Sequence, residues 1–315
     1  HLLKGILANL RESGKSLIVL DPEQEYQELC ENLGGCYLDY LSGEYVINPL
    51  QPQNWDEDPV NEDDERTPEQ RDAAPMSRFP ISELGKLAPA PETSVVPVPG
   101  PFQKTTMLSR HISYLKDFFR SYKDFTTAQL DTIELMLQKL YRRFDMDDYT
   151  DFSQVAPEKF PTMSDFYDLL EEEFDLYDPK RKNLFSEETI QEVCLGLHSM
   201  CKGAESKYFN GHTNIKDDKF LVFGVKGIME LNRSLRDALL FSILSYMTNA
   251  LLGAGNYVGA LDELYLFLTN LTAIEYIRNL MKRDRKKDSL LVLASQNIED
   301  FLQPGVRELT KPLFS

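Results

Sequence analysis

The stretch Tyr257-Val-Gly-Ala-Leu-Asp-Glu263 decides the fold, because five mostly apolar residues run directly into two adjacent acids. A short apolar run of this kind is typical of a strand buried in a parallel sheet. Carboxylates at the exit of a buried strand cost free energy unless they meet a metal ion or another partner. The stretch therefore predicts a buried strand with a chemical site at its carboxyl end. The plainer alternative is a strand followed by an exposed acidic pair.

Strands and helices alternate on both sides of this stretch. The alternation predicts an α/β fold with a mainly parallel sheet and right-handed crossovers, whose ligand site lies at the carboxyl ends of the strands. Besides residues 257–261, strands are predicted at 17–20, 36–38, 220–225 and 289–295, and helices at 2–11, 24–33, 233–252 and 270–286.

Polar residues at the ends of two neighbouring strands suggest nucleotide chemistry. A hydrophobic strand that ends in Asp-Glu is the Walker B pattern. In that pattern Asp262 would hold Mg²⁺, directly or through water, and Glu263 would orient and deprotonate the attacking water. Gln296 ends the next strand and would hydrogen-bond a γ-phosphate or its water, although a glutamine at a strand end is more often a turn residue.

Two further sets of charged residues are candidates. Asp21 ends the strand 17–20 near the expected site, and Glu25 would approach the nucleotide or its water; the alternative is that Asp21 caps the next helix. Cations near the end of helix 270–286 are usually solvated and favoured by the helix dipole, whereas the functional alternative is an arginine finger that reaches a neighbouring subunit's nucleotide. The cations of this cluster are Arg278, Lys282, Arg283, Arg285, Lys286 and Lys287.

Glu12-Ser-Gly-Lys-Ser16 contains the Gly-Lys-Ser triplet of a phosphate-binding loop, but its context is wrong. A Walker A loop reads G-x4-G-K-[ST] and stands between a strand and the helix that it opens. Here Asn9 occupies the place of the first glycine, and a helix precedes the triplet while a strand follows it. We therefore interpret the stretch as the C-terminal cap of a helix, with Lys15 solvated.

Composition limits the classes of function. A net charge of −17 over 315 residues disfavours a broad nucleic-acid-binding face and leaves room only for a local basic patch. The four cysteines match no usual zinc spacing, and the four histidines form no catalytic or metal-binding constellation. The sequence contains neither a signal peptide nor a run of ~20 apolar residues that would predict a transmembrane helix.

Residues 52–104 differ sharply from the rest of the chain. They hold ten of the seventeen prolines and the acidic run DEDPVNEDDE, a composition that cannot bury enough apolar surface to offset the entropy of ordering. We expect a disordered acidic insertion here, with the role of a flexible spacer. Residues 105–204 instead predict a helical subdomain, with a capping box at Thr126–Gln129.

Taken together and in order, these blocks resemble one family, the conjugative-transfer ATPases of type IV secretion systems, in the HerA/FtsK-like branch of P-loop ATPases. The resemblance covers nearly the whole chain apart from the insertion. The blocks that carry it are Leu17-Ile-Val-Leu-Asp-Pro-Glu-Gln-Glu-Tyr26, Ile47-Asn-Pro-Leu50, Pro161-Thr-Met-Ser-Asp165, Phe209-Asn-Gly-His-Thr-Asn-Ile215, Ala260-Leu-Asp-Glu-Leu-Tyr-Leu-Phe267 and Ala294-Ser-Gln-Asn-Ile-Glu-Asp-Phe301.

The resemblance implies a RecA-like P-loop NTPase core in two parts, residues 1–51 and 205–315, interrupted by the insertion and the helical subdomain. It implies ATP hydrolysis with Mg²⁺ that powers channel or pilus assembly, or substrate transfer. Asp262 and Glu263 match the family's Walker B pair, Gln296 matches its sensor glutamine, and the Asp21–Tyr26 block matches its second-strand motif. Arg283 or Arg278 is our assignment for its finger arginine.

The resemblance also implies partners and a location. An arginine finger in trans requires a homo-oligomer, and the family's motors meet the secretion channel at the inner face of the cell membrane, so the chain is expected to be cytoplasmic and peripheral. In this family the Walker A loop immediately precedes the helix at 2–11, so residues 1–315 are expected not to hydrolyse ATP alone. The alternatives are a DNA-pumping translocase of the HerA/FtsK type and a non-catalytic scaffold.

Overall fold

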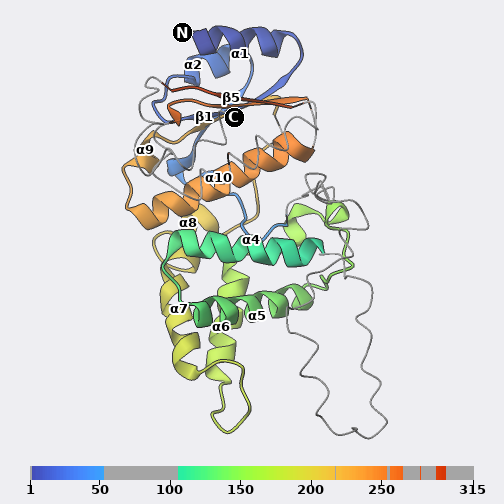
Figure 1. The fold of residues 1–315 in the computed structure, drawn as a ribbon, viewed down its shortest axis with the longest axis vertical. Coiled ribbons are helices and arrows are strands. Elements are labelled where there is room, and N and C mark those ends of the chain that lie inside the picture. The colour runs from blue at the N-terminus through green and yellow to red at the C-terminus, as the bar shows by residue number, and fades with distance from the viewer. Residues whose placement is uncertain are drawn as a thin grey trace, which may run out of the picture. The chain divides into compact units, whose positions relative to one another are not determined.

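The structure, a computed structural model, describes residues 2–52, 106–216, 218–253, 256–264, 277 and 289–295 (Figure 1). The predicted acidic insertion lies almost entirely outside the described residues, and so does the predicted helix 270–286 apart from residue 277. Among the described helices, none is long and apolar enough to cross a bilayer.

A parallel sheet forms the centre of the α/β part of the chain. Within the described residues it has five strands in the order β2-β3-β1-β4-β5, and every neighbouring pair is parallel. The α/β fold class predicted from the alternating pattern is confirmed. The strands are β1 (Ser16–Asp21), β2 (Cys36–Asp39), β3 (Phe220–Gly224), β4 (Tyr257–Leu261) and β5 (Leu290–Leu293).

Strand β1 lies in the middle of the sheet, and its side chains alternate between two cores. Leu17 and Val19 belong to one buried cluster, and Ile18 and Leu20 belong to the other. This period of two is what a strand dictates, and a fully apolar run is needed because both faces are covered. Figure 1 shows helices α1 (Leu2–Glu12) and α2 (Gln27–Asn32) on one face and α10 (Arg233–Gly253) on the other.

The described residues between β2 and β3 are mostly helical. Helix α4 packs against α10, with the rings of Tyr114 and Phe241 centred 5.2 Å apart, and α5, α6 and α7 pack on one another beyond it. The helices of this part are α4 (Met107–Tyr122), α5 (Thr127–Arg143), α6 (Met163–Asp175), α7 (Glu187–Cys201) and α8 (Ser206–Phe209); the short α9 (Lys226–Met229) follows β3, and 3₁₀ turns lie at Tyr40–Ser42, Phe152–Gln154 and Pro157–Lys159.

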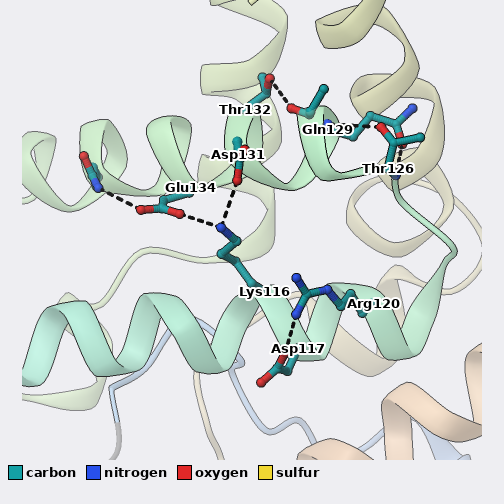
Figure 2. Close-up of polar contacts among 10 residues, drawn as sticks. Lys116, Asp117, Arg120, Thr126, Gln129, Asp131, Thr132 and Glu134 are labelled. Carbon is teal, nitrogen blue, oxygen red and sulfur yellow. Dashed lines mark hydrogen bonds and ion pairs between the residues drawn. The ribbon is translucent and has the colours of Figure 1, made fainter. Parts of the chain in front are cut away.

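Local sequence signals fix where these helices begin. The capping box predicted at Thr126 is confirmed, because its side chain accepts from the Gln129 amide while the Gln129 side chain accepts from the Thr126 amide. Thr162 and Asp165 form a second box at the start of α6. Figure 2 shows how α4 and α5 are then joined by Lys116, whose Nζ lies 3.0 Å from Asp131 and 2.7 Å from Glu134.

The stretch Phe209–Asn214 holds three distant segments together. Asn210 accepts from the main-chain amide of Ser164 at 2.9 Å and donates to its hydroxyl at 2.7 Å, which ties this stretch to the start of α6. Asn214 accepts from the amide of Val46 at 2.8 Å and donates to the carbonyl of Glu44 at 2.7 Å. The sequence alone indicates only a polar turn here, because these partners are far away along the chain.

Asn48 completes this network from the segment after β2. Its main-chain amide donates to Thr213 at 3.0 Å, and its side-chain amide donates to the carbonyl of Pro161 at 2.9 Å. The side-chain oxygen accepts from the amide of Leu50 at 3.0 Å, and the residue is 2 % exposed. Three of the sequence blocks that carry the family resemblance therefore meet at Asn48.

Replacing Asn48 by alanine is expected to lower the free energy of unfolding by about 1–3 kcal/mol, because buried donors and acceptors lose their partners. Denaturant unfolding followed by circular dichroism measures this change. Asn183→Ala is the control, since Asn183 makes a single exposed hydrogen bond to Asp178 and should change stability by less than about 0.5 kcal/mol. Equal effects of the two substitutions would contradict the network.

His111 of α4 is a buried titratable group. Its ring is 0 % exposed, stacks on Tyr114 with ring centroids 5.5 Å apart, and meets the edge of Tyr141 at 6.0 Å. Burial lowers the pKa of His111 to about 3. In the unfolded chain this histidine takes up a proton near pH 6.5, whereas in the folded chain it stays neutral until about pH 3. The free energy of unfolding therefore falls as pH drops from about 6.5 toward 3.

We expect the protonation of His111 in the unfolded chain to lower the free energy of unfolding by about 2 kcal/mol between pH 7 and pH 5. His111→Phe keeps an aromatic ring between the two tyrosines and removes the titration. We expect the variant to lose about 2 kcal/mol less than the wild type over the same pH step. Denaturant titrations at both pH values measure the difference, and parallel losses in the two proteins would refute it.

Candidate functional site

The candidate site lies at the carboxyl ends of β1 and β4. The register places Leu20 beside Leu261, so Asp21 and Asp262 follow at the same level of the sheet. Strand β5 continues the edge, because the amide of Ala294 donates to the carbonyl of Leu261 at 2.9 Å. This is the edge at which parallel α/β sheets bind ligands.

Asp262 follows β4 and is partly exposed. Its Oδ1 accepts from the main-chain amide of Glu263 at 2.9 Å. Its Oδ2 accepts from the hydroxyl of Tyr26 at 2.6 Å, across 236 residues of sequence. Both carboxylate oxygens are therefore held by neutral donors, and the orientation of the carboxylate is fixed from two sides.

Glu263 occupies an unusual backbone conformation for its residue type. Its φ is +47°, in the left-handed region that side chains other than glycine enter at a cost, and the residue is 7 % exposed. Strain of this kind persists where the surrounding structure holds it, often at functional sites. The next amide, that of Leu264, donates to the carbonyl of Ala294 at 2.8 Å, which ties the residues after β4 to the end of β5.

Asp21 closes the turn that follows β1. The residue is 1 % exposed, and its two carboxylate oxygens accept from the amides of Glu25 at 3.1 Å and Tyr26 at 2.9 Å. Burial raises the pKa of Asp21, and the main-chain donors offset part of that rise. The turn delays the helix, so α2 begins at Gln27 and not at residue 24 as the sequence pattern predicts.

Glu25 points to helix α1. Its carboxylate lies 3.3 Å from Nζ of Lys4, and 60 % of its side chain is exposed. The same Lys4 ammonium lies 5.2 Å from the ring centre of Tyr26. Helix α1 is thereby connected to the turn after β1, and through Tyr26 to Asp262.

The contact of Tyr26 with Asp262 is the feature of the candidate site that reasoning from the sequence missed. It ends the Asp21–Tyr26 block, but nothing in the local pattern indicates a partner on another strand. The one feature of the sequence that could have indicated this contact is that Tyr26 is the only aromatic residue in a block of polar and turn-forming residues.

A divalent cation fits the donor set at this edge. The described residues contain no group of three His, Cys, Asp or Glu side chains that could hold a metal ion by themselves. Mg²⁺ does not need one, because it is usually held by one or two carboxylates together with phosphate oxygens and water. Asp262 offers hard oxygen ligands and reaches solvent, which matches that mode.

Three predicted site residues, Gln296, Arg278 and Arg283, lie outside the described residues; β5 ends at the same edge as β4. Lys15 directly precedes the amino end of β1, and six residue steps at ~3.3 Å each separate it from Asp21 by roughly 20 Å. Gly14 has φ +90° and donates to the carbonyl of Arg11, so the predicted helix cap is confirmed.

Comparison with known proteins gives one informative result. No protein-family model matches the chain, and no curated protein matches it. The solved structure of VirB4 from Thermoanaerobacter pseudethanolicus superposes with a TM-score of 0.73 at 25 % sequence identity, over 99 % of this chain and 70 % of that chain. The chain is VirB4-like in structure. The resemblance to the type IV secretion ATPases and the RecA-like fold expected from the sequence are both confirmed.

Substituting Asp21 by asparagine tests the turn that positions Tyr26. One carboxylate oxygen becomes an amide that cannot accept, so a main-chain N–H is left unpaired and unfolding free energy should fall by about 1–3 kcal/mol. Asp39→Asn is the control, because Asp39 is exposed and accepts one hydrogen bond, from Leu41 at 3.2 Å. Denaturant unfolding of both variants measures the contrast, and an unaffected Asp21→Asn protein would argue against the turn.

Proposed function

We propose that this VirB4-like chain belongs to the ATP-hydrolysing motor of a conjugative type IV secretion system, where it powers channel or pilus assembly or substrate transfer. The observation that carries the proposal is the placement of adjacent acids, Asp262 and Glu263, at the carboxyl end of a buried central strand in a VirB4-like fold. Nucleotide hydrolases use acids in that place to hold a metal ion and to activate water.

Asp262 is the proposed metal ligand and Glu263 the proposed general base. Asp262 is held by two neutral donors and reaches solvent, so it can present an oxygen to Mg²⁺ without moving. When bound, Mg²⁺ would neutralise charge on the phosphate oxygens. Glu263 is buried beside it, where a carboxylate can orient a water and take its proton.

Other residues complete the proposed machinery. Gln296 would bond the γ-phosphate or its water from the end of the strand that contains β5, and Arg283 or Arg278 would act as the finger in a neighbouring subunit. Asp21 and Glu25 would shape the edge that the nucleotide approaches: Asp21 holds the turn, and Glu25 pairs with Lys4. The phosphate loop itself is proposed to be the Walker A loop that the family places before α1.

The proposed assembly is a homo-oligomer at the inner face of the cell membrane, in contact with secretion-channel proteins. A finger arginine acts in trans and therefore requires a second subunit. The net charge of −17 favours this role over that of a DNA pump, because a DNA channel needs a concentration of cations.

Glu263→Gln is expected to lower ATP turnover of the full-length protein by about 10²–10⁴-fold while nucleotide binding persists, because the base is lost but the site keeps its shape. Phosphate release and fluorescent-nucleotide binding measure the two properties. Glu28→Gln is the control, since Glu28 is an exposed acid on α2. Turnover that survives Glu263→Gln would refute the assignment of the base, and strong stimulation by DNA would favour the pumping alternative.

A further inference from the structure

Tyr26 joins two strands of the sheet through a single hydroxyl group. Its side chain leaves the turn after β1, and its hydroxyl donates to Oδ2 of Asp262, which follows β4, at 2.6 Å. Tyr26 is 2 % exposed and Asp262 is partly exposed, so the hydrogen bond lies at the border between the core and solvent. A hydrogen bond to an ionised carboxylate in such surroundings is stronger than one between neutral groups.

The position of Tyr26 is itself fixed at two more points. Its main-chain amide donates to Asp21 at 2.9 Å, and the Lys4 ammonium lies over its ring, 5.2 Å from the centre. Lys4 also pairs with Glu25 at 3.3 Å. The hydroxyl is therefore held by the turn after β1 and by helix α1, and it has little freedom to release Asp262.

We propose that Tyr26 is a positioning residue that fixes the carboxylate of Asp262 for a divalent cation. The inference rests on the proposed function, because it needs Asp262 to be a metal ligand. Tyr26 orients Oδ2 and the amide of Glu263 orients Oδ1. Each carboxylate oxygen has two acceptor positions, so the one hydrogen bond that each accepts from the described residues leaves a position on each for a cation or its water.

A tyrosine suits this task for a reason of charge. A lysine or arginine in the same place would form an ion pair with Asp262 and would compete with the cation, whereas a phenol orients the carboxylate and leaves its charge. A phenol has an ordinary pKa of about 10. The hydroxyl consequently remains a neutral donor over the whole working pH range.

The test is Tyr26→Phe in the full-length protein, which removes the hydroxyl and keeps the ring. Mn²⁺ binding is followed by the electron paramagnetic resonance signal of the free ion, with ADP held at saturation. We expect Mn²⁺ affinity to fall by about 10–100-fold, as when other outer partners of metal ligands are removed. The Mg²⁺ concentration that half-activates ATP turnover should rise by a similar factor, and kcat at saturating Mg²⁺ should change less.

Tyr141→Phe is the matched control. Tyr141 is also buried and also donates a hydrogen bond of 2.6 Å, but to the carbonyl of Leu50 in the core beside α5. Its substitution should lower Tm without changing Mn²⁺ affinity. Both variants are measured at a temperature at which thermal unfolding shows them to be folded, so loss of structure is separated from loss of positioning.

A double-mutant cycle with Asp262→Asn decides whether Tyr26 acts through Asp262. If it does, Tyr26→Phe will weaken Mn²⁺ binding in the wild type and add nothing when Asp262 is already replaced. Additive effects, or unchanged Mn²⁺ affinity in Tyr26→Phe while Asp262→Asn is impaired, overturn the inference and leave the proposed function standing. Normal Mn²⁺ binding and turnover in Asp262→Asn overturn the metal role of Asp262 and the inference together.

Discussion

The register of β1 between β3 and β4 is the constraint on which the rest of the structure depends. It places Leu20 beside both Phe223 and Leu261, so the chain leaves neighbouring strands at one level and the acids that follow come together. A slip by one residue would exchange the side chains between the two cores and displace the acids by about 3.3 Å. The apolar contents of both cores therefore set the geometry of the candidate site.

A separate set of contacts connects the sheet to the helical part of the chain. The segment after β2 contains Asn48, whose hydrogen bonds reach Thr213, shortly before β3, and Pro161, at the start of α6. Because these contacts are polar and directional, they hold the connecting segments in one arrangement where apolar packing alone would allow several. The order of the sheet and the attachment of the helices are thus specified by different forces.

The sequence predicted the strands well because buried parallel strands are continuous apolar runs that can be read locally. The start of α5 at Thr126 and the end of α1 at Gly14 were predicted for the same reason, because capping depends on residues close together in the sequence. The start of α2 was predicted too early, because Gln24 has φ +60°, outside the helical region, and Asp21 holds the amides of Glu25 and Tyr26 in a turn. A local turn closed by a side chain outweighs helical periodicity over so short a segment.

Contacts between residues far apart along the chain were not predictable in the same way. The acids of the candidate site could be proposed from a strand-end motif, but the partner of Asp262 lies 236 residues away and leaves no trace in the periodicity. The burial of His111 and the partners of Asn210 and Asn214 likewise depend on how the segments meet in space. A single sequence shows which side chains have chemistry to offer, and the fold decides which of them meet.

The charges at the edge of the sheet explain why the Asp-Glu motif at the end of β4 could predict a candidate site. Lys4 pairs with Glu25 and balances the charge of that acid, whereas Asp21 is buried with its carboxylate oxygens on main-chain amides. Among the described residues, Asp262 contacts two neutral donors, which orient its carboxylate and leave its negative charge in place. A cation that binds such a carboxylate would offset the free-energy cost of its partly buried charge. Where β1 and β4 end, the fold therefore presents an oriented carboxylate of the charge that the proposed cation requires.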